Sequence, residues 1–437
     1  MTQAKFKPVE EQLAYLKKGV AEIIREEDLK AKLEQSAKTG KPLRVYLGVD
    51  PTAPDIHLGH TVVLRKLKHF QDLGHTAIFL IGDFSAMIGD PTGQSETRPP
   101  LTREQVDANA KTYLAQVFKL LDPKKTEVRN NSEWLEKLSS YDVVRLCGHY
   151  RLARMLERED FRSRLSNNQP ISVHELLYPL LTAYDAVALK SDVEIGATEQ
   201  KFNLLVHRDI QREYGVPSEV ALTMPILVGL DGQRKMSKSL NNYVAITESP
   251  QEMFGKMMSI PDELMEPYYE LLTDRTPQEI AAIKKEIGSG TLHPMDVKMR
   301  LAQEVISSFH GEEAARKAAE NFQRVFRDRQ APTEVKEFKL LRVSPKEFHI
   351  YETEGSITAT VAHREVSAVE LSKWAKILVA LDQVPSTSEA ERIIKQGGFE
   401  VDGMTVKDPS ARMDLDQPGA HTVRVGKKKF LRIVVLE

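Results

Sequence analysis

Residues 43–60 read LRVYLGVDPTAPDIHLGH and predict a strand that leads into the first turn of a helix. Residues 43–49 have strand character, and the prolines of 50–54 end the strand, because proline supplies no hydrogen-bond donor to a sheet. The helix is expected from about 58 to 73, and another strand at 76–81. A strand, a helix and a strand at this spacing form one unit of a parallel sheet.

The same alternation continues along the chain, with Thr102 and Ser172 each starting a capping box. Helices are expected at 8–36, 102–121, 172–189 and, in several pieces, 250–330; strands are expected at 127–130, 192–195 and 222–228. Residues 331–333 have the composition of a linker. From about residue 366 the pattern changes to helices at 371–381 and 388–396 followed by short strands.

The predicted fold class is α/β: a Rossmann-like parallel-sheet domain, then an α-helical domain and a small α+β C-terminal domain. We expect an N-terminal helical segment at 1–40, the parallel-sheet domain at 41–245, the helical domain at 246–335 and the C-terminal domain at 366–437.

Composition narrows the class of protein. The 437 residues are 41% hydrophobic and 28% charged, which is typical of a chain with sizeable cores. One cysteine, Cys147, excludes internal disulfides and cysteine-rich zinc sites and favours a reducing cytoplasm. Residues 1–18 show no secretory signal, and apolar runs such as 77–81 are shorter than a membrane span. The net charge of −2 gives no overall case for nucleic acid, so RNA binding would need local basic patches.

His57, Gly59 and His60 fall in the first turn of a helix that follows a strand. A helix N-terminus has unpaired N–H groups that suit phosphate, the imidazoles add donors, and the glycine lets a base or ribose approach the backbone. The alternative is a pair of surface histidines beside an incidental glycine.

Lys235 and Lys238 lie in the string KMSKS, within a loop at 229–240. Two ammonium groups on a mobile loop can close over a triphosphate and neutralise charge as pyrophosphate leaves. The alternative is a charged loop that is simply solvated.

Two further groups suggest a pocket for an amphipathic ligand. Asp90 follows the second predicted strand, where a carboxylate can meet an ammonium, although Asp-Pro-Thr-Gly also suits an ordinary turn. Tyr178, Thr182 and Asp185 share one face of a helix, although they could also be buried polar groups that the fold satisfies. His207 has no metal-ligand spacing, so no structural metal is expected.

Together these motifs resemble the bacterial tyrosyl-tRNA synthetases, which are class I aminoacyl-tRNA synthetases, over essentially the whole chain. The two class I motifs read His-Leu-Gly-His at 57–60 and Lys-Met-Ser-Lys-Ser at 235–239. Residues 366–437 resemble the small RNA-binding domain named after the fourth protein of the small ribosomal subunit, as in Ala390-Glu391-Arg392 and Val401-Asp402-Gly403. The resemblance also implies a homodimer in the cytoplasm.

The resemblance implies a role for each matching residue. Tyr46 and Asp185 would meet the phenolic hydroxyl of tyrosine, Asp90 and Tyr178 its ammonium, and Gln200 its carboxylate. The implied ATP-binding residues are Asp50, His57, Gly59, His60, Glu199, Lys235 and Lys238, with Thr52, His57, His60, Lys235 and Lys238 catalytic. Magnesium would accompany ATP without a dedicated protein cage. A basic cluster at Arg424, Lys427, Lys428, Lys429 and Arg432 would meet tRNA.

Three positions depart from the usual pattern of these enzymes. Thr182 stands where glutamine is common, Ala197 where a second glycine is usual, and Glu199 where aspartate meets the ribose. The reaction class is unaffected, while the contacts to the amino group and the ribose stay open.

The expected reaction is the activation of L-tyrosine by ATP to tyrosyl-adenylate and pyrophosphate, followed by transfer to the 3′-terminal adenosine of tRNA(Tyr). The attacking group is already a carboxylate, so the first step needs alignment and charge stabilisation and no general base. The alternatives are a tryptophanyl enzyme, a small nucleotidylyltransferase that uses HxGH, and a non-catalytic RNA-binding protein on a synthetase scaffold. The pairing of Tyr46 with Asp185 favours a phenol over an indole, and the KMSKS string argues against the nucleotidylyltransferase.

Overall fold

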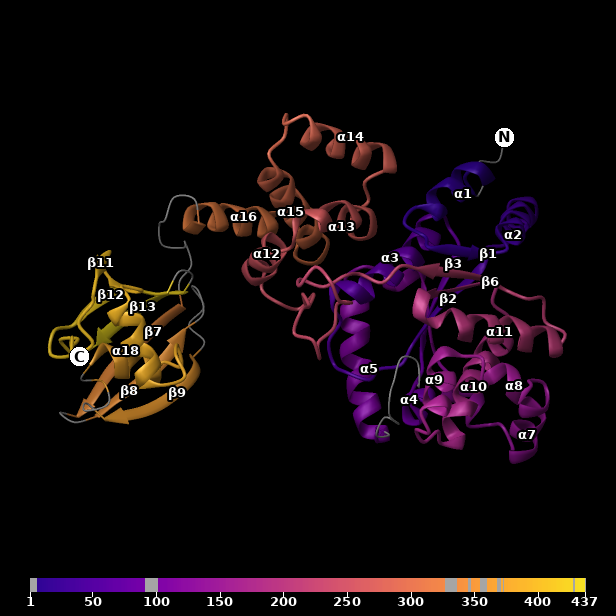
Figure 1. Cartoon of the computed structure of the whole chain (residues 1–437), viewed down its shortest axis with the longest axis horizontal. Helices are drawn as coiled ribbons and strands as arrows, with labels where there is room; N and C mark the ends of the chain where they lie inside the picture. The colour runs from indigo at the N-terminus through magenta and orange to yellow at the C-terminus, as the bar shows by residue number, and fades with distance from the viewer. Residues whose placement is uncertain are drawn as a thin grey trace. The chain divides into compact units, whose positions relative to one another are not determined.

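The computed structural model describes residues 6–90, 101–326, 336–344, 347–353, 360–367, 371, 373–426 and 429–436. The chain forms two compact units, Met1–Ala318 and Ala319–Glu437. Each unit has its own sheet (Figure 1). The linker expected at 331–333 lies outside the described residues.

The first unit is built on a six-stranded sheet in the order β1-β6-β5-β2-β3-β4. The strands are β1 (Glu22–Ile24), β2 (Arg44–Val49), β3 (Thr76–Ile81), β4 (Thr126–Asn130), β5 (Val193–Ala197) and β6 (Val220–Met224). Strands β2 to β6 pair in parallel, as predicted, and β1 pairs antiparallel with β6. From β2 the chain adds β3 and β4 on one side and later β5 and β6 on the other, so the strand order reverses between β2 and β5.

Helices connect and cover these strands. They are α1 (Val9–Lys17), α2 (Glu26–Thr39), α3 (Leu58–Asp72), α4 (Ser85–Ile88), α5 (Arg103–Val117), α6 (Ser132–Leu135), α7 (Ser140–Gly148), α8 (Leu152–Met155), α9 (Glu159–Ser166), α10 (Val173–Leu189) and α11 (Lys201–Glu213). The capping boxes predicted at Thr102 and Ser172 are present at the starts of α5 and α10. After the sheet come α12 (Pro250–Met258), α13 (Met265–Leu272), α14 (Pro277–Gly288), α15 (Pro294–His310) and α16 (Glu312–Phe326).

The single helix expected at 8–36 is wrong. The structure has α1 and α2 there, separated by β1, and Gly19 and Arg25 between them have φ of 64° and 65°. The N–H of Ala21 donates to the carbonyl of Thr223 at 2.9 Å, which starts the pairing of β1 with the edge of β6. An edge distant in sequence therefore overrides the local helical periodicity. The strand expected at 222–228 begins earlier, because Val220 already pairs with Val193 of β5, and ends earlier, because Pro225 directly follows β6.

The second unit carries a seven-stranded sheet in the order β11-β10-β12-β13-β7-β8-β9. Its strands are β7 (Lys336–Ser344), β8 (Glu347–Thr353), β9 (Thr360–Ser367), β10 (Phe399–Val401), β11 (Met404–Thr405), β12 (Gly419–Val425) and β13 (Lys429–Leu436). Two helices, α17 (Trp374–Ala380) and α18 (Thr387–Lys395), bury Trp374 and Ile394 against the sheet. Strand β7 pairs in parallel with β13, so this sheet begins well before residue 366, in a stretch to which the sequence analysis assigned no element.

Within the described residues, no helix combines the length and apolar content needed to cross a membrane.

Candidate active site

A cavity of about 360 Å³ lies at the carboxyl ends of β2 and β5, where the strand order reverses. This is the position at which open parallel sheets bind their ligands. Most of the predicted site residues line it. They are Tyr46, Asp50, Thr52, Gly59, His60, Asp90, Tyr178, Thr182, Asp185, Glu199, Gln200 and Lys235, together with Ala197. His57 contacts Gly59 of this lining, and Lys238 lies close enough to the lining residue His60 to contribute to its lowered pKa.

The two histidines at the start of α3 hold each other in place. The Gly59 N–H donates to Nδ1 of His57 at 3.1 Å, and the His57 N–H donates to Nδ1 of His60 at 3.2 Å. Burial lowers the pKa of His57 to about 2 and that of His60 to about 4. Both rings are therefore neutral near pH 7, and since each Nδ1 accepts a hydrogen bond, each Nε2 carries a proton that it can donate.

Gly59 is required by this arrangement. A Cβ at this position would lie 2.9 Å from Cε1 of His57, closer than atoms can pack without a shift of the ring. The first turn of α3 thus presents the Nε2 donors of two imidazoles beside a position without a side chain. Such a surface suits phosphate and a flat ribose or base.

The KMSKS loop is joined to this helix start. The Lys238 Nζ donates to the carbonyl of Asp55 at 2.6 Å. The chain that follows the loop pairs with the chain before α3: the Leu58 N–H donates to Val244 at 3.0 Å, and the Ile246 N–H donates to Ile56 at 3.1 Å. The two motifs, far apart in sequence, therefore converge on one side of the cavity.

Lys235 and Glu199 face each other at the rim of the cavity. The Lys235 Nζ lies 3.0 Å from Oε1 and 3.2 Å from Oε2 of Glu199. Both side chains are partly exposed, so a ligand can compete for either partner. Glu199 comes from the short 3₁₀ turn Thr198–Gln200 that follows β5.

Asp50 is fixed at the end of β2. Ser85 Oγ donates to its Oδ1 at 2.7 Å, and the phenol of Tyr178 donates to its Oδ2 at 2.9 Å. A Cβ at Gly82 would lie 2.0 Å from Asp50 Oδ1, so only glycine leaves room for this carboxylate. Tyr178 thereby connects α10 to the end of β2.

The inner end of the cavity holds Tyr46 and Asp185, which are 1% and 3% exposed. Asp185 accepts hydrogen bonds from Trp134 Nε1 at 2.7 Å and from Asn131 Nδ2 at 3.3 Å. Burial raises the pKa of Asp185 well above its usual range, although these two donors oppose the shift. A buried carboxyl beside a buried phenol can recognise a hydroxyl group by hydrogen bonding.

Asp90 also lines the cavity, near a buried cation. Nη2 of Arg158 is 4.0 Å from Oδ1 of Asp90 and 2.5 Å from Asp160. Nη1 of Arg158 donates to Asn203 at 3.2 Å. The residues 91–93 that follow Asp90 lie outside the described part of the chain.

Sequence reasoning missed several lining residues: Gly48, Ser85, Glu194, Asn203 and His207. From the sequence, His207 has no metal-ligand spacing and no motif around it. Its spacing from Gln200 and Asn203 places the three on one helix face, and this signal could have assigned it to the cavity.

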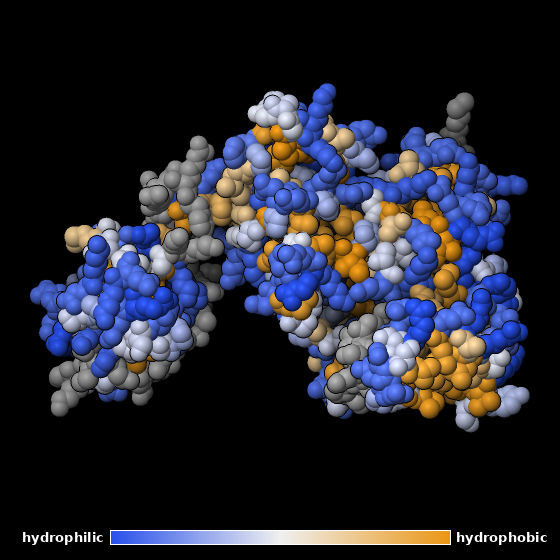
Figure 2. Space-filling model, viewed as in Figure 1, coloured by the Kyte–Doolittle hydropathy of each residue, from blue (hydrophilic) through white to orange (hydrophobic). Residues whose placement is uncertain are grey.

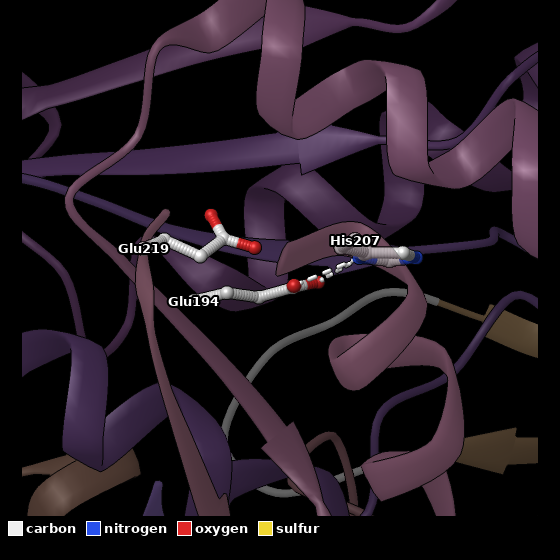
Figure 3. A group of neighbouring side chains, drawn as sticks. All are labelled: Glu194, His207 and Glu219. Atoms are coloured by element: carbon white, nitrogen blue, oxygen red, sulfur yellow. Dashed lines mark hydrogen bonds and ion pairs between the residues drawn. The ribbon is translucent and has the colours of Figure 1, made fainter. Parts of the chain in front are cut away.

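Glu194, His207 and Glu219 form a buried cluster (Figure 3). One ligand atom from each lies within 4.8 Å of the others, which is close enough for a metal ion. Burial raises the pKa of Glu194 to about 7, raises that of Glu219 well above its usual range, and lowers that of His207 to about 4. Protons shared among the three side chains can stabilise this cluster as well as a metal ion would, because two adjacent buried carboxyls do not both ionise.

The predicted tRNA-binding cluster belongs to the second unit. Arg424 forms an ion pair with Glu400, Lys429 donates to the carbonyl of Gln383 at 2.8 Å, and Arg432 lies 3.6 Å from Glu337. Lys427 and Lys428 lie outside the described residues.

Comparison with known proteins agrees with this geometry. The sequence model of the family "tRNA synthetases class I (W and Y)" matches residues 38–327, and that of the S4 domain matches 375–416. The chain belongs to this synthetase family. It is 50% identical over 425 residues to the tyrosine–tRNA ligase of Moorella thermoacetica, which covers 97% of this chain and 96% of that protein. It is equally identical over 425 residues to the tyrosine–tRNA ligase of Aquifex aeolicus, covering 97% and 99% of the two chains.

A solved structure shares the fold over most of the chain. The tyrosyl-tRNA synthetase from Archaeoglobus fulgidus, complexed with L-tyrosine, superposes with a TM-score of 0.58 at 26% identity. The match covers 71% of this chain and all of that one. The α/β class with a parallel-sheet core and an S4-like C-terminal region, expected from the sequence, is confirmed.

Proposed function

We propose that the chain is a tyrosine–tRNA ligase, which activates L-tyrosine with ATP and then esterifies the 3′-terminal adenosine of tRNA(Tyr). One observation carries the proposal. The neutral imidazoles of 57–60 and the ammonium loop of 235–239 meet at one side of a cavity whose inner end holds Tyr46 and Asp185. A triphosphate and a phenol therefore fit at opposite ends of one site.

In the first step, a carboxylate oxygen of tyrosine attacks the α-phosphorus of ATP, and the bond to the bridging oxygen breaks. The electron pair leaves with pyrophosphate. His57 and His60 donate Nε2–H bonds to phosphate oxygens, while Lys235 and Lys238 neutralise the charge that builds on the leaving group. Thr52 lines the same cavity and adds a hydroxyl donor, and Gln200 orients the attacking carboxylate.

In the second step, a hydroxyl of the terminal adenosine attacks the activated carbonyl and AMP leaves. Gly59, His60 and Glu199 would hold the adenosine of ATP in the first step and that of the tyrosyl-adenylate in the second. ATP enters as its magnesium complex, in which the phosphates and water supply most ligands of the cation.

Tyrosine recognition rests on its two polar ends. Asp90 and Tyr178 would receive the ammonium, and Tyr46 and Asp185 the phenol. Phenylalanine would leave the buried Asp185 without this partner, which is costly. Tyrosyl-tRNA synthetases are the known example of this effect, with about 10⁵-fold rejection of phenylalanine.

The second unit would hold the tRNA, as the S4 match supports. Arg424, Lys429 and Arg432 have local partners that phosphates must displace, so each contributes modestly. Lys427 and Lys428 remain part of the proposed contact. The division into segments 1–40, 41–245, 246–335 and 366–437 is part of the proposal, with strands β7, β8 and β9 added to the last segment because they share its sheet. A cytoplasmic location belongs to the proposal, since a single cysteine fits a reducing compartment.

A homodimer is also proposed, because consecutive helices expose large apolar side chains. They are Tyr141 and Val144 on α7, Leu152 on α8, Leu165 on α9 and Val173 at the start of α10, each more than half exposed. Figure 2 shows apolar surface over this region. Apolar groups gathered in this way mark interaction surfaces. Sedimentation velocity should give a dimer that Val144→Glu dissociates, and a monomeric parent chain would contradict the assignment.

Pyrophosphate exchange with each of the twenty amino acids tests the activity directly. Exchange should depend on tyrosine and be absent with phenylalanine and tryptophan. Exchange with another amino acid alone would remove the assignment of the phenol to Tyr46 and Asp185.

A further inference from the structure

His207 lies in the wall of the amino-acid cavity and contacts three different elements. It comes from α11 and is 5% exposed. Its Nε2 lies 3.1 Å from Oγ1 of Thr182 on α10. Its Nδ1 lies 2.8 Å from Oε2 of Glu194 on β5 and 3.4 Å from the phenol oxygen of Tyr46 on β2.

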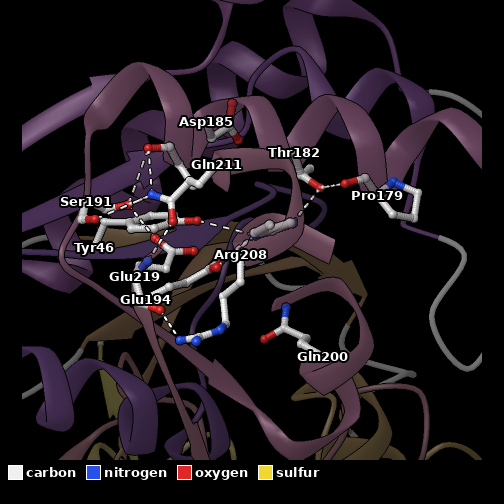
Figure 4. Close-up of polar contacts among 12 residues, drawn as sticks. Tyr46, Pro179, Thr182, Asp185, Ser191, Glu194, Gln200, Arg208, Gln211 and Glu219 are labelled. Atoms are coloured by element: carbon white, nitrogen blue, oxygen red, sulfur yellow. Dashed lines mark hydrogen bonds and ion pairs between the residues drawn. The ribbon is translucent and has the colours of Figure 1, made fainter. Parts of the chain in front are cut away.

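These contacts fix the orientation of the imidazole. The Thr182 hydroxyl donates its one proton to the carbonyl of Tyr178 at 2.9 Å, one turn earlier on α10. Its lone pairs then accept the Nε2–H of His207. The remaining nitrogen shares a proton with Glu194 (Figure 3). Figure 4 shows Tyr46, Thr182 and Glu194 gathered in this region of the structure. Both nitrogens are occupied by protein groups, so His207 acts toward the cavity as a rigid wall.

The position of Thr182 shows which part of the substrate this wall faces. Thr182 follows Tyr178 by four residues and precedes Asp185 by three on the same helix face. At about 1.5 Å per residue, it stands about 6 Å from the level of Tyr178 and about 4.5 Å from that of Asp185. Under the proposed function, these two residues mark the amino end and the phenol end of tyrosine. The wall therefore flanks the aromatic ring between them.

Thr182 is too short to close the cavity there by itself, and the imidazole occupies the space beyond its hydroxyl. We propose that His207 is a specificity-determining residue: it closes the cavity beside the ring of tyrosine and excludes tyrosines substituted at the 3-position. This inference rests on the proposed function.

The test compares L-tyrosine with 3-methyl-L-tyrosine in pyrophosphate exchange. One added methyl in a closed pocket costs about 10- to 200-fold in kcat/KM, so the parent chain should prefer tyrosine by about that factor. His207→Gly opens the wall, and the preference should fall to within about threefold, chiefly through a rise in kcat/KM for the methylated substrate. His207→Gln, which keeps most of the volume, should retain the preference.

Ser191→Ala is the matched control. Ser191 donates to the buried Glu219 of the same network but is absent from the cavity lining. It should lower thermal stability and leave the substrate preference unchanged. An unchanged preference in His207→Gly, with tyrosine exchange still measurable, would overturn the inference. Failure of the parent chain to exchange with tyrosine would instead overturn the proposed function.

A second variant covers the case in which His207→Gly does not fold. Glutamine at position 182 is longer than threonine, and the 3.1 Å contact leaves it no room beside the imidazole. Thr182→Gln should therefore raise KM for tyrosine at least about tenfold, and His207→Gly added to it should restore KM. An unchanged KM in Thr182→Gln would contradict a closed wall at this point.

Discussion

The Lys238 ammonium and the backbone carbonyl of Asp55 form a hydrogen bond of 2.6 Å, which ties the KMSKS loop to the residues just before His57. Partial burial lowers the pKa of Lys238, the opposing effect of Asp55 being smaller. A triphosphate bound at the start of α3 offers this ammonium far stronger acceptors than a carbonyl. If the Lys238 ammonium left the Asp55 carbonyl for phosphate oxygens, the loop would move onto the nucleotide.

Lys238→Ala should lower the rate of tyrosine activation about 10²- to 10³-fold, as expected for loss of one group that stabilises charge in the transition state. Tyrosine binding should change little, because Lys238 is absent from the cavity lining. Single-turnover pyrophosphate release and equilibrium tyrosine binding measure the two effects. Lys284→Ala, at an exposed pair with Glu266, is the control. Equal losses in activation and binding would contradict the role of a mobile ammonium.

Gly59→Ala should displace the His57 ring, since the new Cβ would lie 2.9 Å from it. A displacement of the His57 imidazole by about 0.3 to 1 Å should lower kcat/KM for ATP by about 10- to 100-fold. Gly255→Ala on α12 is the matched control, because a Cβ there meets no atom within 4 Å. It should leave exchange unchanged and stabilise the helix by about 1 kcal/mol. Normal ATP kinetics in Gly59→Ala would show that the glycine is incidental.

Asp185→Asn should lower kcat/KM for tyrosine and narrow the preference for tyrosine over phenylalanine. The asparagine keeps the shape but loses an acceptor for Trp134, Asn131 and the substrate phenol. A loss of about 10²-fold in the preference is expected from two or more weakened hydrogen bonds. Exchange kinetics with both amino acids measure it. If Asp185→Asn lost activity but kept its preference for tyrosine over phenylalanine, the substrate phenol would have to bind away from Asp185.

The stability of the first unit should fall in mild acid because of buried neutral histidines. At His75, Nδ1 accepts from the Leu43 N–H at 3.2 Å and Nε2 lies 2.9 Å from Oε1 of Gln12, so the neutral ring is fully satisfied. Burial lowers the pKa of His75 to about 4, while the unfolded chain titrates near its model value of 6.5. Between these values only the unfolded chain binds the proton, so the free energy of unfolding decreases as pH falls.

The slope from this one group should approach about 1.4 kcal/mol per pH unit. Urea unfolding of the parent chain and of His75→Gln, at several pH values between the two pKa values, checks it. The variant should be less stable at neutral pH, with a shallower dependence on pH. Parallel curves for the two proteins would mean that other groups carry the effect.

Removal of residues 327–437 should leave tyrosine activation intact and reduce tRNA charging strongly. The cut follows α16 and spares the first unit. A cut at 366 is a poor design, because it would remove β13 and expose the edge of β7, where Leu340 is buried. Exchange and aminoacylation assays on the truncated chain separate the two steps. Unchanged charging would leave the second unit without its proposed role.

Local signals were enough to predict much of the first unit. Prolines and glycines limit β2 and α3, and capping boxes at Thr102 and Ser172 give the starts of α5 and α10 correctly. Features that depend on distant pairing were missed. Residues 22–24 form a strand only because the edge of β6 is available, and β7 joins its sheet through β13.

The same distinction holds for the site. Short sequence motifs around His57, Lys235 and Asp90 indicate what these residues do. His207 does not, because its meaning comes from Tyr46, Thr182 and Glu194, which the fold brings together from three other elements.

Strand β1 also serves as a cover. Its three residues occupy the outer hydrogen-bonding groups of β6, from Ala221 to Thr223. Truncation past residue 24, or a fusion that pulls β1 away, would expose the unpaired edge of β6, which is an apolar strand. Uncovered edge strands pair with one another and cause aggregation. Truncations and fusions of this protein should therefore leave β1, which ends at Ile24, in place.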